Sequence, residues 1–149
     1  MSRHYLDSCC FNRPYDNQGN QRVSMETKAI QLIQNEIRAG NIELVTSYIL
    51  RYENDKSPFL VKIIFIEDFI QKYSSIYVTS DREYDVVSIA KNIIDTGVKR
   101  YDAYHVACAI LAKCDSFLST DKRLLKYKAN DIDLLNPVDF LDSYGGNKQ

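Results

Sequence analysis

The sequence predicts an α/β layer fold built around a mostly parallel β-sheet. Two observations carry this prediction: strand-like segments alternate with amphipathic helical segments along the chain, and few tight-turn signals of β-hairpins separate them. The length of 149 residues fits one domain, and a chain of that size buries about 70% of its unfolded surface. We therefore expect a single domain over residues 1–144, followed by a disordered tail at 145–149.

The first half of the chain predicts two strands and three helices. Between residues 24 and 39 the apolar residues recur at helical spacing, with Ser24 as an N-terminal cap and Gly40 as the stop. Pro58 falls in the first turn of a later helix, where proline is tolerated. In order, we expect a strand at 3–7, a loop at 8–22, a helix at 24–39, a strand at 42–47 and helices at 48–54 and 57–73.

The second half predicts three further strands with helices between them. Gly97 follows an amphipathic segment and marks its end, as glycine does after many helices. In order, we expect a strand at 75–80, helices at 81–96 and 102–113, a strand at 115–120, a short helix at 122–126, a strand at 132–137 and a closing helical turn at 138–144.

The charge balance excludes one class of nucleic-acid-binding protein. The formal net charge is −1, whereas a domain that holds nucleic acid by charge alone is usually basic. A polyanion bound by this chain would therefore need local basic residues or a bound cation.

Cysteine usage and hydropathy predict a cytoplasmic protein. The four cysteines form no C-x-x-C spacing, so we expect free thiols rather than a zinc site. The N-terminal residues have no sustained apolar segment of the signal-peptide type. Because the sequence also contains no run of about 18 apolar residues, we expect no membrane span.

Acidic residues fall where α/β sheets form their sites, beyond the carboxyl ends of the strands. Asp7 ends the first predicted strand, and Asp121 follows the fourth. Asp102 opens a helix that starts at the same edge, and Glu53 lies within two turns of the start of the helix after the second strand. We expect these four carboxylates to lie together.

Each acid also has a simpler interpretation. Asp102 and Asp121 could cap helices, Asp7 could favour a turn, and Glu53 could be an exposed helix charge. Four converging carboxylates would repel one another unless cations neutralised them. Because carboxylate and water ligands favour Mg²⁺ or Mn²⁺ over zinc, a converging set predicts a site for one of these ions.

The order and the flanking motifs of these acids resemble the PIN-domain ribonucleases, in particular the VapC-like toxins of toxin–antitoxin pairs. The matching segments are "YLDSC", "TSYILRYE", "DAYHVACAILAKCDSFLSTDKRLL" and "LLNPVDFL", which cover the chain from Tyr5 to about Leu141. The stretch "CFNRPYDNQ" is similar to a PIN subgroup with an Asn-Arg-Pro loop after the first acid. The resemblance implies a PIN-like, three-layer α/β/α fold with a central, mostly parallel sheet flanked by helices.

The resemblance also implies a metal-dependent endoribonuclease that hydrolyses RNA phosphodiester bonds. By this likeness Asp7, Asp102 and Asp121 would bind Mg²⁺ or Mn²⁺, and Glu53 would complete the pocket directly or through water. Asp55 is an alternative to Glu53, because helix register cannot be fixed from sequence. The implied partners are a small antitoxin protein and a second copy of the chain.

Residues beside the acids could position the RNA. By the resemblance, Thr120, or Ser119, would lie beside the acids as a hydroxyl contact. Basic residues near the predicted edge could position the RNA backbone, and they are Arg13, Arg51, Lys99, Arg100, Lys122 and Arg123. His105 could act as a general base, although a packed histidine is the simpler interpretation. The segment 59–73 carries more apolar residues than one side of a surface helix needs, which leaves apolar surface for a partner.

Two other functions compete with the ribonuclease. An α/β hydrolase could use Asp7 as a nucleophile, but Cys9 stands where the haloacid-dehalogenase type requires a second Asp. A PIN-like domain could also serve as a catalytically inactive RNA-binding or scaffold protein. Titration with Mg²⁺ or Mn²⁺ separates these functions, because a scaffold with a broken acid set should not be stabilised by either ion.

Overall fold

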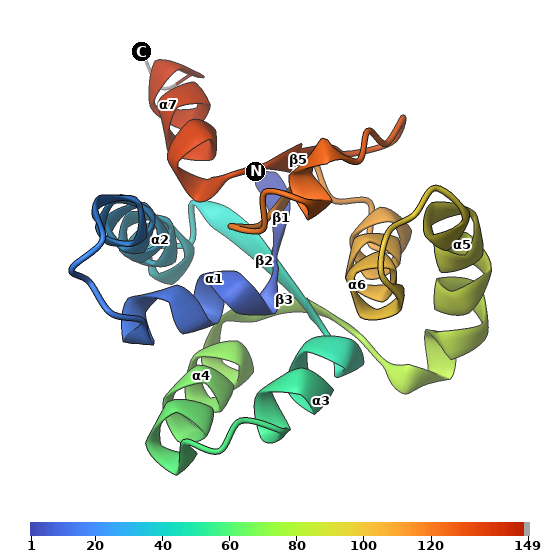
Figure 1. The fold of residues 1–149 in the computed structure, drawn as a ribbon, viewed down its shortest axis with the longest axis horizontal. Helices are drawn as coiled ribbons and strands as arrows, with labels where there is room; N and C mark the ends of the chain where they lie inside the picture. The colour runs from blue at the N-terminus through green and yellow to red at the C-terminus, as the bar shows by residue number, and fades with distance from the viewer. Residues whose placement is uncertain (148–149) are drawn as a thin grey trace.

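A computed structural model describes residues 1–147 as one five-stranded sheet with helices around it (Figure 1). The strand order is β3-β2-β1-β4-β5, and every neighbouring pair is parallel. The strands are β1 (Ser2–Leu6), β2 (Ile42–Ser47), β3 (Ser74–Val78), β4 (Ser116–Leu118) and β5 (Asp133–Leu135). The five predicted strands and their parallel arrangement are confirmed.

The winding of the chain reverses beside β1, the central strand. The chain moves outward from β1 through β2 to β3, and then crosses back to β4 on the other side of β1. At such a switch point the loops after the two central strands diverge and leave a crevice. Here the backbone N–H of Asp7 donates to the carbonyl of Leu118 at 2.9 Å. The segments that follow β1 and β4 are therefore joined at the carboxyl edge of the sheet.

Helices cover both faces of the sheet and complete a three-layer α/β/α fold. In Figure 1, α1, α2, α4 and α7 lie on one side of the sheet, and α5 and α6 lie on the other. The helices are α1 (Ser8–Asn12), α2 (Gln21–Arg38), α3 (Tyr48–Asp55), α4 (Leu60–Tyr73), α5 (Glu83–Asp95), α6 (Arg100–Leu111) and α7 (Pro137–Asn147).

Alternation along the strands divides the interior into two cores. Tyr5 and Phe117 are fully buried in the core that contains α5 and α6. Their neighbours Leu6 and Leu118 face the opposite way, into the core formed with α1, α2, α4 and α7. Each such fully buried side chain stabilises the fold by about 1.5–3 kcal/mol relative to an exposed one.

Helix α3 crosses the carboxyl edge between the two cores. Its residue Ile49 packs in the core with α5 and α6, and the next residue, Leu50, packs in the other core. The hydroxyl of Ser47 caps this helix by accepting from the backbone N–H of Leu50 at 3.2 Å. The helix is therefore held directly above the ends of the strands, which brings Glu53 toward the switch point.

Several helix boundaries differ from the prediction. The stretch predicted to be a loop after β1 contains α1, and α2 begins at Gln21 with Asn20 as its cap, so Ser24 lies inside the helix. The side chain of Asn20 accepts from the backbone N–H of Val23, so the helix is capped four residues before Ser24, the cap that the apolar pattern indicated. Pro58 does not lie in the first turn of α4, because Phe59 is the N-cap of that helix.

The end of α7 lies beyond the predicted end of the domain. Gly145 does not adopt the positive φ that stops the preceding helices at Gly40 and Gly97, and α7 continues to Asn147. Residues 145–147 are therefore helical, although the sequence predicted a disordered tail over 145–149, whose last two residues lie outside the described residues. Within residues 1–147, no helix is long and apolar enough to cross a membrane.

Candidate active site

Asp7 is 4% exposed and connects the segments that follow β1 and β4. Its Oδ1 accepts from the backbone N–H of Ser8 at 2.8 Å, so Asp7 is the N-cap of α1. Its Oδ2 accepts from the hydroxyl of Ser119 at 2.9 Å and from the thiol of Cys9 at 3.4 Å. These contacts fix the carboxylate at the centre of the carboxyl edge.

Asp121 lies in the loop after β4, where its carboxylate binds backbone N–H groups at the start of the 3₁₀ turn Leu124–Lys126. Its Oδ1 accepts from the backbone N–H of Arg123 at 2.9 Å and from that of Leu124 at 3.3 Å. The N–H of Asp121 itself donates to Ser119 Oγ at 3.1 Å. Ser119 therefore contacts Asp7 through its hydroxyl proton and Asp121 through its oxygen.

Asp102 is the third residue of α6 and not its cap. The helix begins at Arg100, and its N-cap, Lys99, makes no capping hydrogen bond with its side chain. A carboxylate in the first turn is favoured by the positive end of the helix dipole. The half-buried Asp102 therefore occupies the start of α6 at the same edge as Asp7 and Asp121, as the sequence predicted, although its capping role was wrong.

Glu53 is bound from two sides in the second turn of α3. Its Oε1 contacts Nε2 of His105 and accepts from the hydroxyl of Ser8 at 3.2 Å. The same Nε2 atom lies 3.9 Å from Oδ1 of Asp7. Asp55, the alternative considered from the sequence, is exposed at the end of the helix.

A buried hydrogen-bonded chain extends from Glu53 into the interior. His105 Nδ1 lies 2.6 Å from the hydroxyl of Tyr5, which lies 2.7 Å from Oγ of Ser47. Tyr5, Ser47 and His105 are all buried. Because Ser47 is also the cap of α3, the chain connects the start of that helix with the carboxylate in its second turn.

The four acids share one electrostatic environment. Burial raises the pKa of Asp102 to about 6, and the charges of Asp7, Asp121 and Glu53 also raise it, while His105 opposes the shift. Like charges within a few ångströms disfavour ionisation in this way. The structure therefore brings the four predicted acids to one edge of the sheet.

His105 and Glu53 shift each other's pKa in opposite directions. Burial alone would raise the pKa of Glu53, but the hydrogen bond and charge of His105 bring this pKa below its ordinary value. Burial alone would lower the pKa of His105, but Glu53, Asp7 and Asp102 bring this pKa above its ordinary value. Both shifts favour an imidazolium–carboxylate pair.

The donor chemistry of the site fits a divalent cation with oxygen ligands. Carboxylates that repel one another are the groups that Mg²⁺ or Mn²⁺ binding would relieve. As the side chains stand, however, no three His, Cys, Asp or Glu residues among residues 1–147 converge closely enough to hold a metal ion. Asp121 is turned toward its own 3₁₀ turn, so cation binding would require its carboxylate to reorient.

Three solved structures align with this chain over most of its length. The structure aligns with a chain of VapBC2 from Rickettsia felis bound to a DNA fragment from their promoter, at 12% identity and a TM-score of 0.55, over 90% of this chain and 98% of that one. FitAcB from Neisseria gonorrhoeae aligns at 19% identity and a TM-score of 0.56, over 90% and 97%. FitAB bound to the IR36 DNA fragment aligns at 20% identity and a TM-score of 0.55, over 91% and 95%.

The chain has the fold of a VapC-like PIN domain. No family profile and no curated protein matches the sequence significantly. The fold is therefore established by structural alignment over about nine tenths of the chain, and the roles of individual residues depend on the geometry of the site itself.

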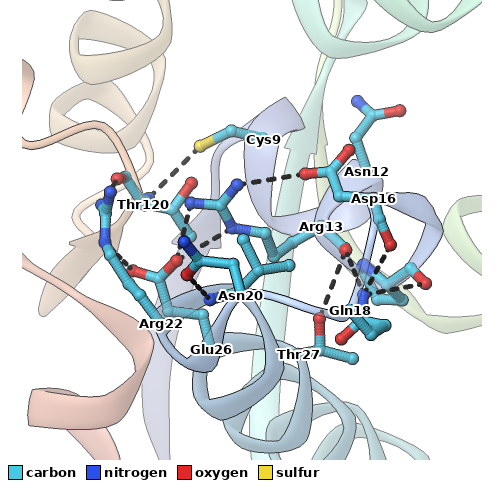
Figure 2. Close-up of polar contacts among 12 residues, drawn as sticks. Cys9, Asn12, Arg13, Asp16, Gln18, Asn20, Arg22, Glu26, Thr27 and Thr120 are labelled. Atoms are coloured by element: carbon cyan, nitrogen blue, oxygen red, sulfur yellow. Dashed lines mark hydrogen bonds and ion pairs between the residues drawn. The ribbon is translucent and has the colours of Figure 1, made fainter.

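Beside the acids, this PIN fold contains a buried ion-pair network centred on Glu26 of α2 (Figure 2). Glu26 is 2% exposed and contacts the guanidinium of Arg13 at 2.7 Å and that of Arg22 at 3.2 Å. Asn136, after β5, donates to the same carboxylate at 2.6 Å. Arg22 also donates to the carbonyl of Thr120 at 2.5 Å, so the network holds the loop between β4 and Asp121.

The predicted substrate contacts lie in different environments. Arg13 is engaged by Glu26 and, at 3.1 Å, by Asp16, so its side chain has little capacity left for RNA. Thr120 is buried, and its backbone N–H donates to the sulfur of Cys9 at 3.3 Å. Lys122 is exposed beside Asp121, where a phosphate could reach it.

Two residues of this edge were not predicted for the roles they take. Glu26 binds the loops, and His105 binds Glu53 rather than packing without a carboxylate partner. Ser119, which was expected beside the acids as an alternative to Thr120, does contact Asp7 through its hydroxyl. The partners of His105 are 52 and 100 residues away, so no local pattern indicates them. Glu26 lies on an amphipathic helix, where a glutamate usually faces solvent.

Proposed function

We propose that this protein is a metal-dependent endoribonuclease and the toxin of a toxin–antitoxin pair. One observation carries the proposal: Asp7, Glu53, Asp102 and Asp121 share the carboxyl edge of a PIN-type sheet, where their charges help to raise the pKa of Asp102. In a structural ion pair the two opposite charges neutralise each other. Several carboxylates gathered at one edge are instead stabilised when they bind a cation.

Asp7, Asp102 and Asp121 would hold one or two Mg²⁺ or Mn²⁺ ions. When bound, the metal would lower the pKa of an attacking water and neutralise the charge that develops on the scissile phosphate. Ser119 would keep the carboxylate of Asp7 oriented through its 2.9 Å hydrogen bond. Thr120 is fixed by Arg22 and Cys9, and would order the loop that carries Asp121.

Glu53 would receive the proton of the attacking water. Its Oε1 is occupied by His105 and Ser8, which leaves Oε2 as the acceptor. Because the pKa of Glu53 lies below its ordinary value, the carboxylate is ionised at neutral pH. Water would attack phosphorus in line, the P–O bond to the leaving ribose oxygen would break, and that oxygen would take up a proton from solvent water.

The partners proposed for this protein are a small antitoxin and a second copy of the chain. The exposed face of α4 and of the residue before it offers a surface for one of these two partners, because its large apolar side chains are more than half exposed. They are Phe59, Leu60, Val61, Ile64 and Phe65. A contiguous apolar surface of this kind is typical of protein–protein contacts. An antitoxin bound there would lie on α4, beside α3, which carries Glu53.

A catalytically inactive RNA-binding or scaffold protein is the second candidate. The observation that favours it is that the carboxylate of Asp121 is bound to backbone N–H groups of its own loop. In that case neither Mg²⁺ nor Mn²⁺ would raise the melting temperature, and RNA would bind without being cut.

An RNA-cleavage assay tests the proposed function. Purified chain should cut single-stranded RNA in the presence of Mg²⁺ or Mn²⁺, and EDTA should stop the reaction. Asp7→Asn and Asp121→Asn should each reduce cleavage by about 100-fold or more, the scale of losing an electrostatic group that acts in the transition state. Cleavage that continues unchanged in both variants would reject the mechanism.

A further inference from the structure

A cavity of about 440 Å³ opens beside Asp102, between the turn that joins α5 to α6 and the segment that follows Asp121. Among residues 1–147, Asp102 is the one carboxylate in its lining. A volume of this size falls in the range of pockets that hold a small ligand or a nucleotide unit. The cavity therefore adjoins the acids, and one of the four, Asp102, forms part of its wall.

Four basic side chains line this cavity. Lys99 comes from the N-cap of α6, and the others come from the segment after Asp121: Arg123, Lys126 and Lys128. All four residues are exposed. Tyr127 also contributes to the wall, so an aromatic ring lies among the cations.

None of these four cations has an acidic partner among the described residues. Arg13, Arg22 and Arg51, in contrast, are bound to Glu26 or Glu67. The cavity therefore concentrates positive charge that no ion pair compensates, although the formal net charge of the whole chain is −1.

The start of α6 adds to the attraction for an anion. Lys99 makes no side-chain cap, so the first backbone N–H groups of this 12-residue helix have no partner supplied by the N-cap side chain. The positive end of the helix dipole lies there as well. The cations and the start of the helix suit the phosphates of a single nucleic-acid strand, and the aromatic ring in the wall suits its bases.

We infer that this cavity binds the RNA strand next to the scissile phosphate, with Lys99 and Lys126 contacting backbone phosphates. The inference rests on the proposed function, and it assigns the substrate path to the α5–α6 turn rather than to Arg13. Arg123 and Lys128 extend the same positive surface. Phosphate contacts position a strand without reading its sequence, so binding here is expected to tolerate different bases.

The experiment measures RNA binding apart from cleavage. A fluorescein-labelled, single-stranded RNA oligonucleotide of mixed sequence is titrated with the intact chain in EDTA, and fluorescence anisotropy is recorded at several salt concentrations. Lys99→Gln/Lys126→Gln should weaken binding about ten-fold at low salt. The slope of log K against log salt should fall by about 1.4, because each phosphate of a single strand that a lysine neutralises adds about 0.7 to this slope.

Matched variants control for charge and folding. Lys28→Gln/Lys91→Gln removes two exposed lysines of α2 and α5 that do not line the cavity, and it should leave the slope within about 0.3 of wild type. Lys99→Arg/Lys126→Arg keeps both charges and should bind like wild type. Thermal unfolding of each variant shows that the fold is retained.

Unchanged binding and slope in Lys99→Gln/Lys126→Gln would overturn the inference, as would equal losses in the Lys28→Gln/Lys91→Gln control or no RNA binding by wild type. If RNA binding depends on Lys99 and Lys126 but neither Mg²⁺ nor Mn²⁺ supports cleavage, the proposed nuclease function is rejected and the RNA-binding role of the cavity is retained. If the protein cleaves RNA but its RNA binding does not depend on these two lysines, the cavity is rejected as the substrate path and the proposed nuclease function is retained.

Discussion

His105 and Glu53 form a side-chain pair across 52 residues of sequence, in which Nε2 of the histidine contacts Oε1 of the glutamate. The histidine is buried, and its other ring nitrogen is bound to Tyr5. A carboxylate on a short helix at the edge of a sheet is thereby connected to the centre of the core. His105 is thus a positioning residue, which holds Glu53 ionised and oriented.

The coupling between His105 and Glu53 should depend on pH in a defined window. The pKa of Glu53 is lowered from 4.5, so its contribution to stability is present above pH 4.5 and is lost as pH falls through the folded-state pKa. The pKa of His105 is raised from 6.5, so its contribution is present below pH 6.5 and is lost as pH rises through the folded-state pKa. The pair is therefore fully formed between pH 4.5 and 6.5.

A double-mutant cycle of His105→Gln and Glu53→Gln measures this coupling by urea unfolding. The interaction free energy should be about 2 kcal/mol near the middle of that window, the value of a hydrogen bond to a charged group. It should decline on both sides. A coupling that is absent, or that does not change with pH, would mean that the two side chains do not form an ion pair.

Asp102→Asn should stabilise the metal-free protein at neutral pH. Because the folded-state pKa of Asp102 is raised from 3.8 to about 6, the wild type loses stability as pH rises through this range, whereas asparagine cannot ionise. The difference in melting temperature should thus grow between pH 4 and pH 7 and vanish below pH 4. Mg²⁺ or Mn²⁺ should raise the melting temperature of the wild type but have less effect on the variant. A variant less stable than wild type at pH 7 would contradict the proposed repulsion.

The edge that carries the acids was predictable because parallel strands end at a common edge. Asp7 and Asp121 directly follow β1 and β4, so their placement requires only the strand assignments. The position of Asp102 was harder to predict than those of Asp7 and Asp121, because the start of α6 is set by the backbone at Lys99 and not by a capping side chain. The cap of the 3₁₀ turn is Arg123 and not Asp121, although the carboxylate of Asp121 accepts from the backbone N–H groups of Arg123 and Leu124.

The contacts that fix the acids could not be read from the sequence. Ser119 joins two of them through hydrogen bonds that depend on the register between β1 and β4. Arg13 was predicted to contact RNA because it is basic and follows the first acid, but the structure pairs it with Glu26. Such long-range pairing of charges leaves no periodic pattern in a single sequence, unlike the apolar faces of helices.

Glu26→Gln should destabilise the protein strongly. Glu26 is buried and compensates the charges of Arg13 and Arg22, so removal of its charge leaves the largely buried guanidinium of Arg13 without its main partner. Breaking a buried pair in this way costs about 3–5 kcal/mol. Asp68→Asn is the matched control, because it removes an exposed i,i+4 pair with Lys72 that is worth less than about 1 kcal/mol. Urea unfolding of both variants checks the difference, and equal effects would refute the importance of the Glu26 network.

The exposed face of α4 should mediate association. Leu60 and Ile64 are 68% and 55% exposed, so Leu60→Lys/Ile64→Lys should change the free energy of unfolding by less than about 0.5 kcal/mol per site. Introducing two charges should nevertheless disrupt an apolar interface, because the charges would have to be desolvated there. Sedimentation velocity should therefore show self-association by wild type and a monomeric variant. Tyr84→Lys/Val87→Lys, on the exposed face of α5, provides the control and should associate like wild type. Equal self-association of all three proteins would exclude α4 as the surface for a second copy and leave it to the antitoxin.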